Sequence, residues 1–170
     1  GQRHVGRQMT DHVTLEGLFG YSDLDGYRDP SIRIPDHQFL DISANLRLNL
    51  TGAEADPALR AKRYQAAIDM CAWGEDKGFR SVHLSEHHGS EDGYCPSPLL
   101  LASAIASRTQ TMQMYISALI APLHDPVQLA EDICILDIIS RGRVIPIISG
   151  GYREEEFNAV GKELRIRKQY

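Results

Sequence analysis

Side chains that can exchange protons or bind a metal ion stand together in one segment, Ser85-Glu86-His87-His88-Gly89. The residues just before it form a short run typical of a β-strand. Alternation along that strand puts His83, Ser85 and His87 on one face and Val82 and Leu84 on the other. The carboxyl ends of parallel strands face the active site in α/β folds, so we expect the polar face to point into it and the aliphatic pair to pack on helices. A histidine there can transfer protons near neutral pH. The alternative is that His87 only hydrogen-bonds the loop backbone.

A metal site is a second interpretation of the same segment. Glu86, His87, His88 and Asp92 are all potential ligands. Their spacing matches no helix-borne zinc motif, and neighbouring histidines on a strand point to opposite sides. We therefore expect no metal site at these residues.

Two later segments also follow predicted strands. Pro122-Leu123-His124-Asp125-Pro126 contains a proline-bounded turn, and Asp125 is expected to cap the next helix. In Ser149-Gly150-Gly151-Tyr152 the paired glycines allow a backbone to approach a flat ring or an anion closely. The simpler interpretation of the glycine pair is a tight turn.

The elements that must position these residues alternate between strand and helix. Strands are predicted over Phe39–Leu50, Arg80–Ser85, Met112–Ala121 and Arg143–Ser149. Helices are predicted over Ala58–Lys77, from Ser97 to about Arg108, from Asp125 to about Ser140, and over Arg153–Val160. Ser97-Pro98 and Asp125-Pro126 are typical helix starts. Glycines and prolines break up residues 1–37, which are expected to form a leader or loop region, partly disordered, with a short strand near Leu15–Phe19.

This order predicts the α/β class, with parallel strands joined by right-handed crossovers. Two architectures fit the order: an open doubly wound sheet, or part of a (β/α)8 TIM barrel. No G-x-G-x-x-G motif follows the first strand, which disfavours the doubly wound fold. A complete barrel needs about 250 residues, so residues 38–170 are expected to supply about the first four β/α units, the amino-terminal half of a barrel.

Composition excludes several classes of function. The formal net charge is −5, which gives no basic surface for nucleic acid. No apolar run approaches the about 20 residues that a membrane span needs, and residues 1–8 do not resemble a secretory signal. The three cysteines, Cys71, Cys95 and Cys134, form no C-x-x-C pair. They are expected to be reduced thiols of a cytoplasmic protein.

Four segments in order carry a resemblance to a known family: S-E-H-H-G-S-E-D-G-Y-C-P-S-P, A-P-L-H-D-P-V-Q-L-A-E-D, L-D-I-I-S-R-G-R and S-G-G-Y-R-E-E-E-F-N-A-V-G. In content and spacing they resemble the bacterial-luciferase-like flavin-dependent monooxygenases over about Phe39 to Gly161. The E-H-H and H-D-P-V…E-D forms are closer to the FMN branch of that family than to the deazaflavin (F420) branch.

The resemblance implies a barrel that binds reduced FMN, with F420 as the alternative, and that uses O2 to oxidise a small organic substrate. It also implies a flavin reductase as the supplier of reduced FMN. By position, His87 matches the active-site histidine of the family, and Ser117-Ala118 matches a non-proline cis peptide under the flavin ring. Gly150, Gly151 and Tyr152 lie where relatives contact the cofactor. Some relatives have arginine at the position of Gly150, so an anion contact from that residue is not expected here.

Departures from the family pattern leave other functions open. Pro146 lies inside the fourth strand and cannot donate to a sheet, which predicts an edge strand. Four further barrel strands, which normally supply much of the phosphate site, are missing from residues 1–170. We therefore expect weak flavin binding, or none, from this chain alone. The alternatives are a non-catalytic or truncated luciferase-like subunit and a metal-dependent barrel hydrolase.

The helices after Ser97 and after Asp125 are apolar over more of their circumference than packing on one sheet requires. Their outer faces would leave an apolar patch of the kind that marks an interface. The resemblance points to the same helices as a dimer interface. We expect a two-fold homodimer built on them; the alternative is that other parts of the same chain cover them.

Overall fold

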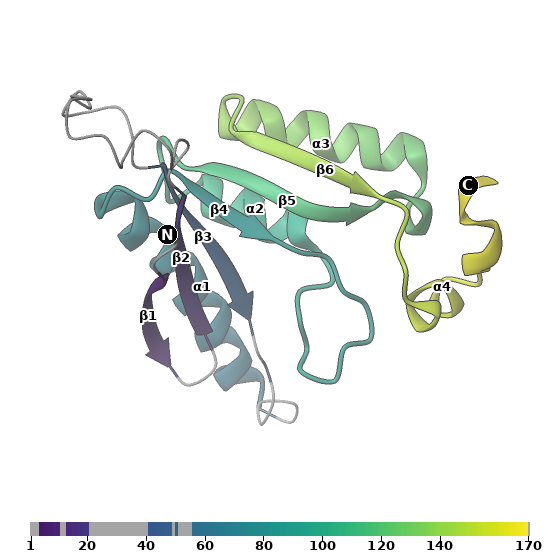
Figure 1. The fold of residues 1–170 in the computed structure, drawn as a ribbon, viewed down its shortest axis with the longest axis horizontal. Helices are drawn as coiled ribbons and strands as arrows, with labels where there is room; N and C mark the ends of the chain where they lie inside the picture. Colours follow the sequence, from purple (N-terminus) through teal and green to yellow (C-terminus); the bar gives the residue numbers. More distant parts are fainter. Residues whose placement is uncertain (1–3, 11–12, 21–40, 49, 51–55, 170) are drawn as a thin grey trace, which may run out of the picture.

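The computed structural model describes residues 4–10, 13–20, 41–48, 50 and 56–169, which form one six-stranded sheet with helices packed on it (Figure 1). The strands are β1 (His4–Thr10), β2 (Val13–Gly20), β3 (Asp41–Leu48), β4 (Ser81–Leu84), β5 (Gln113–Ile120) and β6 (Val144–Ser149). The helices are α1 (Pro57–Asp76), α2 (Pro98–Ala106), α3 (Pro126–Ser140) and α4 (Glu154–Ala159). Two 3-10 helices follow strands or helices, η2 (Ala121–Leu123) and η3 (Leu164–Gln169).

Strands β3 to β6 are parallel and lie side by side in chain order. Helix α1 packs on β2 and β3, α2 on β5, and α3 on β6, while α2 contacts both α1 and α3. A barrel requires this consecutive order, whereas a doubly wound sheet reverses its order at a switch point. The expected α/β class and the parallel strand–helix alternation are confirmed.

The amino-terminal residues differ from the sequence prediction. Strands β1 and β2 form an antiparallel hairpin, and β2 continues antiparallel onto β3 with Val13 opposite Leu48 and Gly20 opposite Asp41. The predicted loop was therefore wrong for residues 4–10 and 13–20, although the short strand near Leu15–Phe19 lies within β2. The local sequence of these strands favours a β-strand only weakly. Their backbone hydrogen bonds come from pairing across the sheet to β3, which the local sequence does not contain. The remainder of the predicted 1–37 leader lies outside the described residues.

Helix starts follow the cap signals only in part. The Asp125 side chain accepts hydrogen bonds from the backbone N–H groups of Val127 (2.9 Å) and Gln128 (3.0 Å), as predicted. Ser97 occupies the N-cap position of α2, but its hydroxyl makes no capping bond. Helix α1 has a cap that the sequence prediction missed, because Asp56 accepts from Ala58 N and Leu59 N. No helix of the described residues is long and apolar enough to span a membrane.

The core lies between the sheet and α1–α3. Val82 and Leu84 on β4 are buried there with Met114 and Ile116 on β5, and Ile105 of α2 covers them. The predicted division of β4 into a helix-facing aliphatic face and an opposite polar face is therefore confirmed. Among the described strands β6 pairs with β5 alone, and Pro146 lies opposite Ile116 in that pairing; whether this strand is an edge strand stays a prediction.

Candidate active site

The polar face of β4 lies against β5. The imidazole of His83 stacks on the ring of Tyr115, with centroids 4.8 Å apart and planes 7° from parallel. Partial burial lowers the pKa of His83 below its ordinary value of 6.5, which favours the neutral ring. Two residues further on, the Ser85 hydroxyl donates to the Ser117 carbonyl oxygen over 2.8 Å. The end of β4 is therefore tied to the end of β5 directly before the E-H-H segment.

Glu86 is a buried carboxylate that joins three segments at this edge. Its Oε1 accepts from His88 Nε2 and from His124 Nε2, both at 2.7 Å, and its Oε2 accepts from Ile120 N at 2.6 Å. Burial pushes the pKa of Glu86 upward. The hydrogen bonds from His124, Ile120 and His88 outweigh burial and hold that pKa below its ordinary value of 4.5. The group is therefore a carboxylate at neutral pH, and both histidines donate to it from Nε2.

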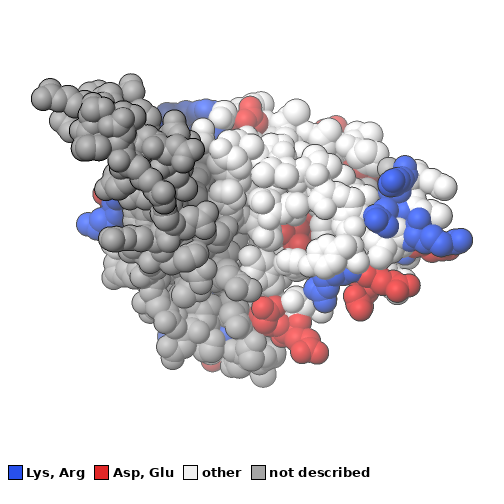
Figure 2. Space-filling view, in the orientation of Figure 1, with Lys and Arg blue, Asp and Glu red and all other residues white. Residues whose placement is uncertain are grey.

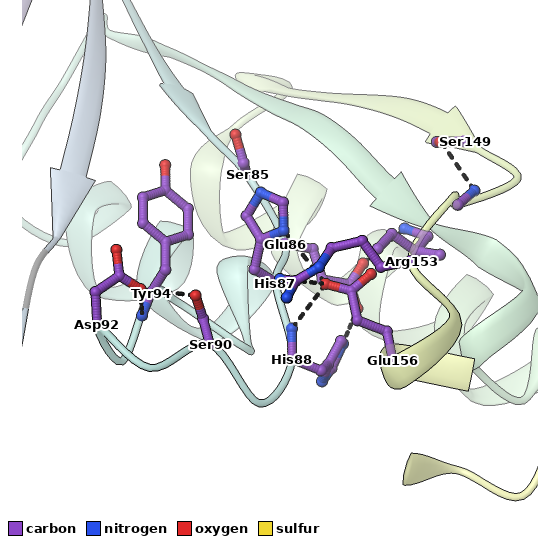
Figure 3. A network of polar contacts seen from close by, with 12 residues as sticks. Ser85, Glu86, His87, His88, Ser90, Asp92, Tyr94, Ser149, Arg153 and Glu156 are labelled. Atoms are coloured by element: carbon purple, nitrogen blue, oxygen red, sulfur yellow. Dashed lines mark hydrogen bonds and ion pairs between the residues drawn. The ribbon is translucent and has the colours of Figure 1, made fainter. Parts of the chain in front are cut away.

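His87 contacts a second buried carboxylate, Glu156 of α4. Glu156 Oε1 lies 3.3 Å from His87 Nδ1 and accepts from the backbone N–H of His88 at 3.1 Å. Arg153 Nη1 is 3.6 Å from the same oxygen. Figure 3 shows the two sides meeting, with the histidines on the loop after β4 and Arg153 and Glu156 on the segment after β6. The ring of His87 thus has a side-chain partner, so the interpretation that it only bonds loop backbone was wrong.

The loop after β4 is held by its own hydrogen bonds. Asp92 Oδ1 accepts from the Ser90 hydroxyl (2.7 Å) and from Tyr94 N (3.1 Å). Tyr94 then meets the His87 ring edge to face, with centroids 5.2 Å apart and an interplanar angle of 69° (Figure 3). The backbone N–H of His87 donates a hydrogen bond to the backbone carbonyl of Cys95 at 3.1 Å. Together these contacts fix the backbone and the ring plane of His87.

The peptide bond between Ser117 and Ala118 is cis, as the family resemblance implied. The pairing of β5 with β6 shifts register between Ser117 and Leu119. Both Ser117 and Ala118 are half-buried at the edge that carries His87. The structure therefore brings these two residues and the end of β4 to one edge of the sheet.

The glycine pair after β6 has two different environments. Gly151 has a φ of +70°, and a Cβ there would lie 2.7 Å from Ile120 Cγ2, so the turn itself requires glycine. Gly150 is exposed, and a Cβ there would meet only Arg167, at 3.7 Å from Nε. Tyr152 is 73% exposed and makes no described contact with His87. The tight turn explains Gly151, whereas nothing in the packing of the described residues requires glycine at 150.

The residues considered as metal ligands have other partners. His88 bonds Glu86, and Asp92 bonds the loop that contains it. Within the part of the chain that the structure describes, no group of three or more His, Cys, Asp or Glu side chains is arranged to hold a metal ion.

Sequence reasoning missed two residues of this site. The sequence placed Glu156 only within the predicted helix Arg153–Val160, and His124 only within a predicted turn. In α4, residues 156 and 157 are buried and their neighbours are exposed. Burial distinguishes Glu156 from Glu154 and Glu155, but it is known only once the position of the helix on the sheet is known. Its partner His87 is 69 residues away in sequence, which no local pattern reveals.

Comparison with known sequences finds relatives that are named as monooxygenases. Over 102 residues the chain is 28% identical to the oxygenase component of flavin-dependent trigonelline monooxygenase from Acinetobacter baylyi. The aligned region covers 59% of this chain and 28% of that protein. Over 90 residues it is 31% identical to the alkanal monooxygenase alpha chain of Photorhabdus laumondii, covering 53% and 25% respectively. The matched region thus spans only about a quarter of the length of these curated relatives.

Solved structures share the fold. The oxygenating constituent of 3,6-diketocamphane monooxygenase from Pseudomonas putida, solved in complex with FMN, superposes with a TM-score of 0.59 at 24% identity, over 64% of this chain and 33% of that one. A monooxygenase from Streptomyces bottropensis gives a TM-score of 0.61 at 24% identity, with the same coverage of 64% and 33%. The sequence model of the luciferase-like monooxygenase family matches residues 47–170, which include the ends of β4, β5 and β6. The chain belongs to the luciferase-like monooxygenase family.

Proposed function

We propose that this chain contributes the His87 side of the active site of a flavin-dependent monooxygenase that uses reduced FMN and O2 on a small organic substrate. One observation carries the proposal. His87 lies at the carboxyl edge of parallel strands with its Nδ1 held by Glu156, while its Nε2 has no hydrogen-bond partner among the described residues. A proton-transferring group needs an oriented ring with one nitrogen left for the ligand.

The surroundings of His87 fit a flat, largely apolar ring. Figure 2 shows that the face carrying β5 and β6 is mostly free of charged side chains, which gather instead around α4, at the end of the chain and at the lower edge of the view, where the loop after β4 lies in Figure 1. Gly150 is exposed and leaves its backbone open to close approach. In the proposed site the flavin ring lies near Ser117 and Ala118, and the backbone of Gly150 and Gly151 and the side chain of Tyr152 contact the cofactor. Four consecutive parallel strands then form part of a (β/α)8 barrel.

The cofactor supplies electrons that activate O2, and the protein residues orient it and exclude water. FMN is proposed over F420 because the FMN complex of a structural neighbour and the flavin-dependent name of a relative point to the same cofactor class. A separate reductase would supply reduced FMN, since the trigonelline enzyme is named as an oxygenase component. With three free cysteines among the described residues, we propose a cytoplasmic enzyme.

Apolar side chains on the outer faces of α2 and α3 support the proposed homodimer. Leu100 is 74% exposed and Ile138 is 77% exposed, and Val127, Ile135 and Ile139 are exposed with them. A groove of about 260 Å³ between the two helices is lined by Leu99, Leu100, Ser103, Asp132, Ile135, Leu136 and Ile139. Under two-fold symmetry, the same apolar surface of a second copy would pack against this groove.

Chemical-shift mapping tests the cofactor proposal even where binding is weak. We expect that FMN, fully reduced and kept anaerobic, moves the backbone amide signals of residues 85–88, 117–118 and 150–152 in the ¹⁵N-labelled chain, with saturation in the millimolar range. Riboflavin, which lacks the phosphate, should move the same signals, and F420 should move them less. His87→Ala should weaken the shifts and keep the fold.

The absence of shifts at the sheet edge, or shifts confined to the outer faces of α2 and α3, would overturn the proposal. Tighter binding of F420 than of FMN would overturn the choice of cofactor alone. A His87→Ala variant that loses its dispersed spectrum would indicate a structural role for His87.

A further inference from the structure

The carboxylate of Glu156 is fully buried, and all of its described contacts are made by one oxygen. Oε1 faces the His88 backbone N–H at 3.1 Å, His87 Nδ1 at 3.3 Å and Arg153 Nη1 at 3.6 Å. The peptide N–H of His88 and the guanidinium of Arg153 can only donate hydrogen bonds. Oε1 is therefore an acceptor, and the hydrogen bond to His87 forms only if Nδ1 carries a proton.

This contact decides which nitrogen of His87 is free. A neutral imidazole has one protonated nitrogen and one acceptor nitrogen. With the proton on Nδ1, Nε2 is the acceptor. No hydrogen-bond partner for Nε2 is found in the described residues, and the side chain remains 29% exposed. The edge-to-face contact with Tyr94 restricts rotation of the ring away from this arrangement.

The second oxygen of Glu156 argues against a merely structural contact. Oε2 is buried without a hydrogen-bond partner among the described residues. An unpaired buried polar atom is unfavourable for folding, so a site selected for stability alone would place a smaller or apolar residue there. The carboxylate is retained where it faces a histidine at the proposed active site. Glu154 and Glu155, the neighbours of Glu156 in α4, are exposed.

We propose that Glu156 is a positioning residue that fixes His87 as the Nδ1–H tautomer, so that Nε2 accepts a proton from a ligand or water bound at the mouth of the strands. The proton moves to Nε2 and the donor keeps its electron pair. The resulting imidazolium holds protons on both nitrogens, and its charge faces the Glu156 carboxylate. The tautomer assignment stands on the geometry; the identity of the proton donor rests on the proposed flavin site.

Nitrogen NMR of the imidazole ring reports the tautomer directly. We propose long-range ¹H–¹⁵N correlation spectra of the full chain, recorded at a pH at which the ring signals themselves show neutral His87. The parent protein should show a protonated Nδ1 and an unprotonated Nε2 at His87. Glu156→Gln keeps an oxygen acceptor and should keep this pattern. Glu156→Met keeps side-chain length but removes the acceptor, and should convert His87 to the Nε2–H form that predominates in free imidazole side chains.

Glu155→Met is the matched control, because it makes the same change at the exposed neighbouring position; it should leave the His87 pattern unchanged. A parent protein with its His87 proton on Nε2 overturns the proposal without any variant, as does a folded Glu156→Met protein that keeps the Nδ1–H pattern. If the ring pattern is as expected but FMN moves no signal at the strand ends, the tautomer assignment stands and only the proposed flavin function fails.

Discussion

Glu86 shows how one buried side chain can hold several segments of a site in place. It accepts hydrogen bonds from the loop after β4, from the last residue of β5 and from the residue after η2. Lys162 also holds the backbone around His124. Its ammonium group donates to the carbonyl of Pro122 at 2.6 Å and to the carbonyl of His124 at 3.3 Å. The position of His87, the next residue after Glu86, therefore depends on this carboxylate.

Replacement of Glu86 by glutamine should destabilise the fold and change its pH dependence. The amide nitrogen replaces one carboxylate oxygen, so either the Ile120 N–H loses its acceptor or both histidines must change tautomer to accept from the amide. We expect a cost of about 3 kcal/mol in the free energy of unfolding. Because the hydrogen bonds hold the folded-state pKa of Glu86 below 4.5, the unfolded chain binds this proton more readily. The stabilisation by the Glu86 carboxylate is complete above pH 4.5, the ordinary pKa of the group, and is lost as the pH falls through the lower folded-state pKa.

Urea denaturation at several pH values measures both effects. Glu86→Gln should be less stable than the parent near neutral pH, and its stability should fall less steeply below pH 4.5. The residual slope in both proteins includes Glu75. Burial raises its pKa, but hydrogen bonds from the backbone of residues 110–112 outweigh burial and lower it. Glu155→Gln, the same change at an exposed site, is the control, and equal acid slopes for the parent and Glu86→Gln would contradict the argument.

At the scale of residues, the sequence predicted what local alternation determines. It assigned His83, Ser85 and His87 to one polar face. The structure stacks His83 of β4 on Tyr115, whereas Ser85 and His87 follow the end of β4 at Leu84. The partners of these residues were not predictable, because Ser117 and Glu156 come from later β/α units and meet β4 only through the strand order. Types such as Glu and His also have many exposed uses, so their identity alone does not indicate pairing.

At the scale of elements, Arg143 connects the amino-terminal side of the sheet to two helices. Its Nε donates to the Ser140 carbonyl at the end of α3, and its two Nη atoms donate to the Ala106 carbonyl at the end of α2 and to acceptors in the turn before β5. The fork geometry of the guanidinium allows these bonds at once. The sequence segment S-R-G-R places this side chain directly before β6.

Arg143→Lys should therefore destabilise the protein even though it keeps the charge. A lysine ammonium is a compact point charge with three donors and cannot span the carbonyls of two helices, so we expect a loss of about 2 kcal/mol. Arg141→Lys is the matched control, because Arg141 is exposed two residues away. Thermal unfolding of the two variants measures the difference. A melting temperature for Arg143→Lys equal to that of Arg141→Lys would show that the fork is not needed.

Elements with strong local signals were predicted and those that depend on pairing were not. The Asp125-Pro126 start of α3 and the apolar runs of β4 to β6 are local signals, and they placed these elements nearly correctly. The β1–β2 hairpin has glycines within its strands and depends on β3 for its backbone partners. Its stability comes from pairing across the sheet, which a window of sequence does not contain.

At the scale of the whole molecule, the two faces of the sheet have different requirements. The helix-covered face buries the core, and the other face, with the end of β4, carries the candidate active site. Helices α2 and α3 also expose apolar side chains outward, away from the core that they cover. Few monomeric proteins leave a contiguous apolar surface of this kind in water. The proposed dimer would cover it while leaving the carboxyl edge of the strands open.

The test of the dimer uses one charge on α3. Ile135 is 57% exposed and lines the groove between α2 and α3, so Ile135→Glu would bury a carboxylate in the interface and weaken association strongly. Val160→Glu makes a comparable change at a residue that is 43% exposed and lies outside both helices, and it should leave association unchanged. Light scattering at micromolar concentration should give twice the chain mass for the parent and for Val160→Glu, and the chain mass for Ile135→Glu. Because Ile135 is on the surface, the variant should keep its fold, which circular dichroism checks. A parent that is monomeric, or a folded Ile135→Glu protein that dimerises as well as the parent, would show that this surface is covered in some other way.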